Sequence, residues 1–338
     1  MTSYSPLLLP LTLAFCLSFS ILAVALKSGI TRYLAMDRPN QRSLHTLPVP
    51  RIGGIAIIVA TLIAWNFTGG ESRRVLMTVT VALAVVSYID DWMGLPVLLR
   101  LAAHGMAAAV FAMLGLVDSV QNIWIAMGLV MYIVWMTNAN NFMDGADGLA
   151  GGMALFGFSA YGLAACAAEA EAMAAISFSV AAAAGGFLLL NFPPAKVFMG
   201  DAGSIPLGFL AAVLGIMGSR QDLWPFWFSA LVFSPFLVDA SVTLVRRIWH
   251  GERFWQAHRE HYYQRLIRMG WGHRRTALSE YLLMFSVAAS AVLGLRLEPE
   301  LQWSILAAWL MAFVCLMLAI DRRWQDFLRA TNSGGNGG

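Results

Sequence analysis

The sequence has few charged residues. Only 12% of its 338 residues are Asp, Glu, Lys or Arg, about half the ~25% typical of a soluble globular domain. The net charge of +3 is too small to indicate a nucleic-acid partner. The three cysteines, Cys16, Cys166 and Cys315, all lie inside apolar runs, which argues against disulfides and cysteine metal sites. Because 59% of the residues are hydrophobic, we expect an all-α polytopic integral membrane protein rather than a soluble enzyme.

Apolar segments long enough to cross a bilayer recur along the chain. A transmembrane helix needs ~20 mainly apolar residues, and the runs between polar breaks predict about eleven. They cover residues 6–26, 52–68, 73–89, 97–116, 120–136, 150–167, 172–190, 204–218, 223–245, 277–295 and 301–320. The first lacks the basic start and cleavage pattern of a signal peptide. We expect residues 1–330 to form one membrane-embedded domain and residues 331–338 to form a flexible tail.

Lys and Arg are distributed unevenly between the predicted connections. All but four of the 22 lie in alternate connections or in the C-terminal segment, the exceptions being Arg73, Arg74, Arg220 and Arg296. Such an excess marks the cytoplasmic side, which predicts an outside N-terminus and a cytoplasmic C-terminus. Most polar motifs share that side. We therefore expect a cytoplasmic active site built from the loops 27–51, 90–100, 137–150, 191–204 and 246–276.

Two adjacent acids, Asp90 and Asp91, end the third predicted span. Neighbouring carboxylates near a membrane boundary repel each other and are costly to dehydrate. They can serve as solvated helix ends, or they can hold a cation or accept a proton from a substrate.

A polar segment at residues 138–152 separates two predicted spans. It contains three amides and two carboxylates beside glycines, including Asn138, Asn141, Asp144 and Asp147. If the last three lie on a helical turn, their spacing places them on one face. Glycines let a charged ligand approach the backbone closely. A binding segment therefore fits better than a plain hydrophilic turn.

A third polar cluster covers residues 191–204 and contains Asn191, Phe198 and Asp201. Asp201 lies in a Gly-rich turn before the next span. Carboxylate oxygens are good ligands for Mg²⁺, which is also coordinated by the phosphates of a substrate. Phe198 fits stacking on a base and packing equally well.

The loop after the ninth predicted span is rich in Arg and His. His258 and His261 are three residues apart, so on a helix they would share a face with Arg265. These side chains suit phosphate oxygens. A zinc site lacks a well-spaced third ligand, and a basic surface helix that binds anionic lipid is the alternative.

Together these segments resemble the polyprenyl-phosphate N-acetylhexosamine-1-phosphate transferases of glycosyltransferase family 4. The resemblance rests on Asp90-Asp91, on the Asn-Ala-Asn-Asn-Phe-Met-Asp-Gly-Ala-Asp-Gly-Leu-Ala stretch from Asn138, on Phe198-Met-Gly-Asp-Ala-Gly-Ser204, on the His258/His261 loop and on Pro48-Val-Pro-Arg51-Ile-Gly-Gly54. It covers residues 30 to 280. It implies transfer of a HexNAc-1-phosphate from a UDP-sugar to undecaprenyl phosphate, with release of UMP, in the bacterial inner membrane.

The resemblance also implies roles for individual residues. The expected catalytic residues are Asp90, Asp91, Asp144, Asp147, His258 and His261. The expected substrate-binding residues are Arg51, Arg100, Asn138, Asn141, Asn191, Phe198, Arg259 and Arg265. Asp201 and Asp91 are the expected ligands of Mg²⁺, with Mn²⁺ as an alternative ion. The expected partners are the two substrates and membrane lipid, and a homodimer is left open.

The chain departs from the family pattern at two places. Trp92-Met-Gly follows the aspartate pair where a third acid often stands, and His258-Arg-Glu-His261 replaces the consecutive histidines of the muramoyl-pentapeptide enzymes. The loop looks more like that of the branch that starts O-antigen or related surface glycans. We therefore expect an enzyme of that branch and keep a muramoyl-pentapeptide transferase as the alternative.

Two other classes of protein share some of these features, and two reaction routes are compatible with the sequence. A secondary transporter would show an internal repeat, which this sequence lacks, and a lipid-binding scaffold would not need three Asp-bearing motifs. The sequence leaves open direct attack by the prenyl phosphate and a phospho-aspartate intermediate. We favour direct attack because the nucleophile is already charged.

Overall fold

The protein is almost entirely helical in the part that the structure describes. The structure is a computed structural model that describes residues 5–37, 48–68, 73–115, 122–252 and 258–334. The elements, in order, are α1 (Ser5–Ser28), η1 (Ile30–Tyr33), β1 (Met36–Asp37), β2 (Val49–Pro50), α2 (Gly53–Trp65), α3 (Arg73–Met93), α4 (Val97–Gly115), α5 (Ile123–Phe142), α6 (Leu149–Ala167), α7 (Glu171–Asn191), α8 (Asp201–Arg220), α9 (Phe226–Val232), α10 (Ser234–Trp249), α11 (Tyr262–Leu266), η2 (Ile267–Trp271), α12 (Gly272–Gly294) and α13 (Pro299–Gly334).

The predicted all-α polytopic membrane fold is confirmed. Among the described residues, nine helices are long and apolar enough to cross a membrane, or ten if α9 and α10 form one bent span. The predicted segment that is missing from this count, 52–68, corresponds to α2, whose 13 residues fall short of the ~20 that a crossing requires. The count therefore depends on α2, while every predicted apolar segment coincides with a helix or with the bent pair.

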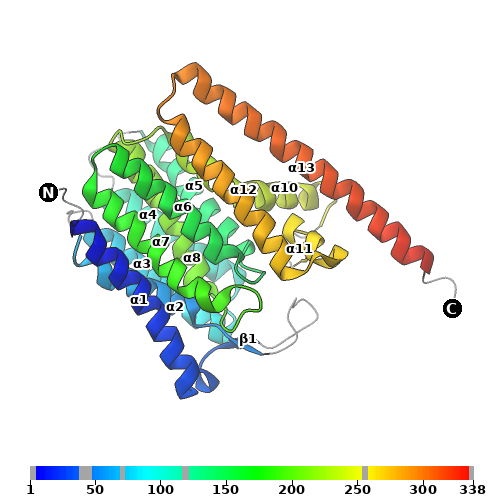
Figure 1. Ribbon diagram of the computed structural model, residues 1–338, viewed down its shortest axis with the longest axis horizontal. Coiled ribbons are helices and arrows are strands. Elements are labelled where there is room, and N and C mark those ends of the chain that lie inside the picture. Colours follow the sequence, from blue (N-terminus) through cyan, green and yellow to red (C-terminus); the bar gives the residue numbers. More distant parts are fainter. Residues whose placement is uncertain (1–4, 38–47, 69–72, 116–121, 253–257, 335–338) are drawn as a thin grey trace.

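The predicted span 223–245 is broken rather than continuous. The chain bends by 77° between α9 and α10, and α10 lies across the direction of the other helices in Figure 1. Pro235, in the first turn of α10, has no backbone N–H, so an uninterrupted helix would lose a hydrogen bond there. The break carries α10 toward the loop that contains His258 and His261.

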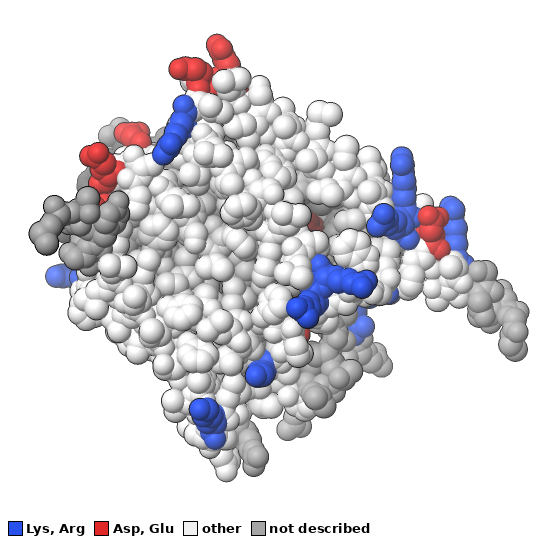
Figure 2. Space-filling model, in the orientation of Figure 1, with Lys and Arg blue, Asp and Glu red and all other residues white. Residues whose placement is uncertain are grey.

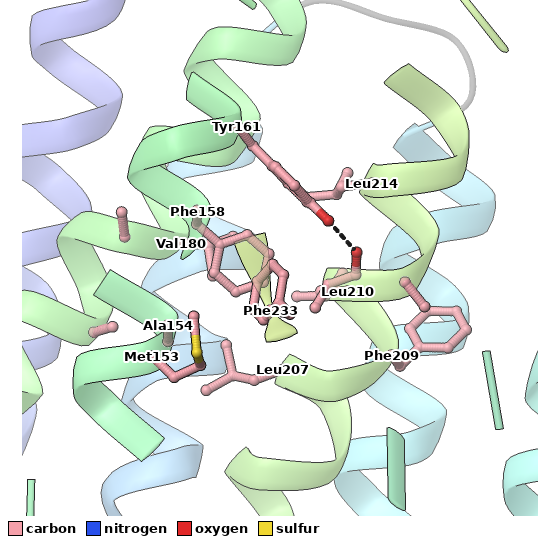
Figure 3. Close-up of a cluster of buried hydrophobic side chains, with 14 of the residues drawn as sticks. Met153, Ala154, Phe158, Tyr161, Val180, Leu207, Phe209, Leu210, Leu214 and Phe233 are labelled. Carbon is pink, nitrogen blue, oxygen red and sulfur yellow. Dashed lines mark hydrogen bonds between the residues drawn. The ribbon is translucent and has the colours of Figure 1, made fainter. Parts of the chain in front are cut away.

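Helix α8 occupies the centre of the bundle. Of its most apolar stretch 94% is buried, and it packs against α2, α3, α5, α6 and α9. On one side, Tyr161 of α6 donates a hydrogen bond from its hydroxyl to the carbonyl oxygen of Ala211 over 2.8 Å, above a cluster with Phe158 and Phe233 (Figure 3). The first residue of this central helix is Asp201, so the core of the fold fixes the position of one candidate metal ligand.

Charged side chains lie mainly at the two ends of the bundle. On the face drawn in Figure 2, a broad band almost free of Asp, Glu, Lys and Arg separates an acidic upper end from lower and right-hand margins where Lys and Arg gather. A band of this kind suits the hydrocarbon layer.

The C-terminal helix α13 is long and mostly exposed, and it runs along the edge of the bundle (Figure 1). It continues to Gly334, so residues 331–334 of the predicted flexible tail are helical. Residues 335–338 lie outside the described residues, as do residues 38–47 and 253–257 of two predicted loops.

Candidate active site

The segment around Arg51 is held against the start of α8 by backbone hydrogen bonds. β1 and β2 form a short antiparallel pair, and Arg51 then forms a parallel bridge with Phe198. Gly53 N–H donates to Phe198 O over 2.9 Å, and Gly54 N–H donates to Met199 O over 2.8 Å. The segment that leads into α2 is therefore joined directly to the Phe198–Asp201 motif, which lies far away in the sequence.

This junction requires a glycine at position 54. A Cβ at Gly54 would lie 2.1 Å from the backbone nitrogen of Gly203, and one at Gly203 would lie 2.4 Å from Cα of Gly54. Such contacts lie far inside normal packing distances. The two glycines let the starts of α2 and α8 approach each other, which brings Arg51 to the site.

Asp91 anchors the first turn of α8. Its side chain has 0% exposure, and its Oδ2 accepts a hydrogen bond from the Ala202 N–H over 3.1 Å. Its Oδ1 is 3.3 Å from Arg51 Nη1, and the same guanidinium lies 2.9 Å from Asp37 through Nη2. Both oxygens of Asp91 therefore already orient other parts of the site.

Asp90 and Asp201 face a common cation, Arg100. Arg100 Nη1 lies 3.2 Å from Asp90 Oδ2 and 3.8 Å from Asp201 Oδ2, while Asp90 Oδ1 accepts from the Leu95 N–H over 2.6 Å. The Asp201 side chain is 25% exposed, against 5% for Asp90. Asp201 is thus the acid of this cluster with the most open carboxylate.

The segment after Asn138 is only partly helical. α5 ends at Phe142, so Asp144 and Asp147 lie in the following loop, and the expected shared helical face with Asn141 is wrong. Gly148, the N-cap of α6, has φ +78°, a left-handed conformation that other residues rarely adopt, so the chain does not continue as one helix into α6. The amides at the end of α5 instead hydrogen-bond either to Ser204 of α8 or to the α5 backbone.

Two of the three amides of this segment contact Ser204, and the third contacts its own helix. Asn141 Oδ1 accepts a 2.7 Å hydrogen bond from the Ser204 hydroxyl in the first turn of α8, and Asn140 donates to Ser204 O over 2.7 Å. Asn138 donates to Val134 O within its own helix. The structure therefore brings Asn141 next to the acidic cluster.

Asp144 also belongs to the acidic neighbourhood. Burial raises the pKa of Asp144 well above its usual range, and the nearby carboxylates of Asp201 and Asp91 raise it further. The site thus gathers like charges from three separate motifs, an arrangement that a bound cation would stabilise.

Asp147 and Asn191 hold loops together. Asp147 Oδ2 accepts from the Ala195 N–H over 3.0 Å, and Asn191 accepts from the Gly148 N–H and donates to Val197 O. His273 Nδ1 lies 3.3 Å from Asp147 Oδ1. His273 was not expected in the site, although its Gly-Trp-Gly-His-Arg-Arg segment carries polar residues beside a span.

The two histidines do not share a helix face. α11 begins at Tyr262 with His261 as its N-cap, so the expected helix through His258, His261 and Arg265 is wrong. The loop nevertheless brings the two rings to a centroid distance of 4.8 Å. Burial lowers the pKa of His258 to about 4, so His258 is neutral at physiological pH.

The arginines of this loop differ in their surroundings. Arg265 lies 2.8 Å from Asp321 of α13, which also receives both Nη atoms of Arg246. Arg259 accepts a hydrogen bond at its carbonyl oxygen from Arg268. Arg265 therefore joins the loop to α13 rather than standing free beside the acids.

A magnesium ion fits the acidic cluster chemically. Within the residues that the structure describes, no group of three or more His, Cys, Asp or Glu could by itself hold a metal. Mg²⁺ does not require such a cage, because it is usually bound by one or two carboxylates together with waters and substrate phosphates. Asp201 offers an open carboxylate for that donor set, and the adjoining Asp91 would have to exchange its contact with Arg51 for the ion.

The site thus combines acids, two arginines and amides at one end of a membrane bundle. The family model described as glycosyl transferase family 4 matches residues 74–219. A probable undecaprenyl-phosphate N-acetylglucosaminyl 1-phosphate transferase of Bacillus subtilis is 30% identical over 285 residues, covering 80% of this chain and 78% of that protein. The chain belongs to glycosyl transferase family 4. The family predicted from the motifs is confirmed.

Other relatives in the family carry related names. A decaprenyl-phosphate N-acetylglucosaminephosphotransferase of Mycobacterium tuberculosis is 30% identical over 88% of this chain and 85% of its own length. A phospho-N-acetylmuramoyl-pentapeptide-transferase of Chloroflexus aurantiacus is 30% identical over 77% of this chain and 81% of its own length. The matched family region contains the three Asp-bearing motifs, whereas Arg51 and the His258/His261 loop lie outside it.

Proposed function

We propose that this protein transfers a HexNAc-1-phosphate from a UDP-sugar to undecaprenyl phosphate and releases UMP. The observation that carries the proposal is the convergence of Asp90, Asp91 and Asp201 with Arg51 and Arg100 at one end of a membrane bundle. The activities for which the relatives from Bacillus subtilis and Mycobacterium tuberculosis are named support the same reaction. The product would be the first lipid-linked intermediate of a surface polysaccharide such as O-antigen, made at the cytoplasmic face of the plasma membrane.

The acceptor needs positioning more than deprotonation. A phosphate monoester has a second pKa near 6, so it is mostly dianionic at neutral pH. The barrier lies in bringing that dianion to a charged diphosphate, which requires positive charge and precise placement. Arg51 and Arg100 each span two carboxylates, so they supply cationic groups whose orientation is set before the substrates arrive.

The other residues of the site contact different parts of the substrates. When bound, Mg²⁺ would neutralise the diphosphate and stabilise the departing UMP. Asp201 and Asp91 would hold it, and Asp144 and Asn141 would border the nucleotide. Asp147 and Asn191 keep the loop before α6 on the segment before α8. Direct attack by the prenyl phosphate remains our favoured route.

Removing divalent cations should stop the reaction without releasing zinc. We expect EDTA to abolish transfer and Mg²⁺ alone to restore it, with Mn²⁺ as a substitute, because hard oxygen ligands favour these ions. Among the described residues, no third His, Cys, Asp or Glu joins His258 and His261 to complete a zinc site. Metal analysis of purified protein checks this. Stoichiometric zinc that is lost in His261→Ala would contradict it.

The donor should be an N-acetylated hexosamine, either UDP-GlcNAc or a 6-deoxy or C4-epimeric relative. The nucleotide and metal motifs are common to the family, so sugar choice should fall on the polar His258–His261 loop. A site that hydrogen-bonds a particular hydroxyl rejects an analogue lacking it by about 10⁴-fold. UMP release from a panel of UDP-sugars, with undecaprenyl phosphate as acceptor, measures this preference. Preferred turnover of UDP-MurNAc-pentapeptide would instead favour the activity named for the Chloroflexus relative.

A further inference from the structure

Asp239 is a buried carboxylate on α10, a helix predicted only as part of an apolar span. It lies in the wall of a chamber of about 490 Å³ between α10, α11, α12 and α13, and most of the residues lining this chamber are apolar. An ionisable side chain in such surroundings is costly, and it is usually kept because it holds a specific partner. No motif that supports the proposed function contains this residue.

Among the described residues, Asp239 has most of its hydrogen-bond partners at the start of α11. Its Oδ1 lies 3.0 Å from His261 Nδ1 and accepts from the Tyr262 N–H over 3.1 Å, and its Oδ2 accepts from the Tyr263 N–H over 3.3 Å. The fourth contact is the Thr243 hydroxyl, one turn along α10, at 3.0 Å from Oδ1. Asp239 therefore hydrogen-bonds both to the His261 ring and to the backbone that follows it.

These contacts determine how the His261 ring is presented. With Nδ1 hydrogen-bonded to a carboxylate, the ring proton is held on Nδ1, and Nε2 is the nitrogen left for another group. The ring also stacks against Phe142 at 6.3 Å and Tyr263 at 5.8 Å, so it cannot swing away freely. Phe142 ends α5, two residues before Asp144, which places His261 beside the segment that borders the acidic cluster.

We propose that Asp239 is a positioning residue for sugar-phosphate transfer, fixing the orientation and tautomer of His261 so that Nε2 is offered to the substrate. The substrate group is a hydroxyl of the donor sugar, which can donate to an unprotonated Nε2. This inference rests on the proposed function. The bend between α9 and α10 then places the Asp239 carboxylate against His261.

A double-mutant cycle tests whether Asp239 acts through His261. The measurements are kcat and KM from UMP release, with UDP-GlcNAc and undecaprenyl phosphate, for Asp239→Ala, His261→Ala and the double variant. Partners that orient a functional imidazole typically contribute about 10–100-fold, so Asp239→Ala should lower kcat by that factor with little change in KM. In the His261→Ala background, Asp239→Ala should lower kcat no further, because the group it positions is already gone.

Two control variants separate positioning from folding. Thr243→Val removes the other side-chain donor to Asp239 Oδ1 without touching His261, and it should retain kcat within about 2-fold and the wild-type melting temperature. Asp239→Asn keeps an acceptor oxygen for the α11 backbone but loses the charge, so it should fold and show an intermediate kcat. It provides the test if Asp239→Ala does not fold.

Several results would overturn the inference. An equal and independent loss of kcat from Asp239→Ala in both backgrounds would make Asp239 a structural residue only. Wild-type kcat in His261→Ala, with transfer intact in the parent protein, would remove this inference while leaving the proposed function standing. An absence of transfer by the parent protein would remove the proposed function and this inference together.

Discussion

Asp201→Asn should lower sugar-phosphate transfer by at least about 10²–10³-fold, the loss typical when one charge-stabilising group is removed from an active site. Asp201 has the most open carboxylate of its cluster, and Arg100 lies 3.8 Å from its Oδ2. Asn has the same shape but lacks the charge that Mg²⁺ requires. Because the exchange also relieves repulsion from Asp90 and Asp91, the variant should be as abundant and as stable as the parent.

The matched control is Asp326→Asn. Asp326 has an exposed side chain on α13 and, among the described residues, makes only a 3.8 Å ion pair with Arg329, which contributes little to stability. Its replacement should leave turnover and its Mg²⁺ dependence unchanged. Near-normal turnover in Asp201→Asn, with the usual Mg²⁺ response, would remove Asp201 from the metal role.

Gly54→Ala should destabilise the fold by at least about 3 kcal/mol, at or beyond the upper end for an overpacked core. The added Cβ would meet the Gly203 backbone nitrogen at 2.1 Å, and a helix backbone cannot move aside as a flexible side chain can. Native proteins have only about 5–15 kcal/mol of stability, so we expect a large fall in melting temperature in detergent. Because the junction also seats Arg51 and Asp201, the remaining folded protein should transfer poorly.

Gly105→Ala provides the comparison. Gly105 is a helical glycine in α4, and a Cβ there would meet nothing within 4 Å. Alanine at such a site is usually favourable by about 0.5–1 kcal/mol. Equal melting temperatures for the Gly54 and Gly105 variants would contradict the close approach of α2 and α8.

Much of the fold could be predicted because membrane spans are encoded by uninterrupted apolar length. Each predicted apolar segment contains a helix, including the Gly-rich 204–218, which proves to be the central α8. The 77° bend between α9 and α10 could not be predicted with the same rule, since both halves are apolar. Pro235 was the available signal, but proline is tolerated in membrane helices whenever neighbours satisfy the freed groups.

The candidate site was predictable where its residues stand in compact polar motifs. Asp90, Asp91 and Asp201 form one cluster as expected, and Asn141 and Asp144 border it. The i, i+3 argument failed for Asp144, Asp147 and the two histidines, because glycine turns and an N-cap interrupt the assumed helices. Isolated residues such as Asp239 and His273 were missed, since their importance depends on contacts with segments far away in sequence.

Sugar-phosphate transfer is tested most directly by following the sugar and its phosphate separately. Purified protein is incubated with undecaprenyl phosphate and UDP-GlcNAc that carries ³H in the sugar and ³²P in the phosphate next to it. If the protein transfers the sugar phosphate, both labels enter the organic phase in equal amounts with one UMP released per lipid, and EDTA prevents this until Mg²⁺ is added. Entry of ³H without ³²P, with UDP as the by-product, would contradict sugar-phosphate transfer.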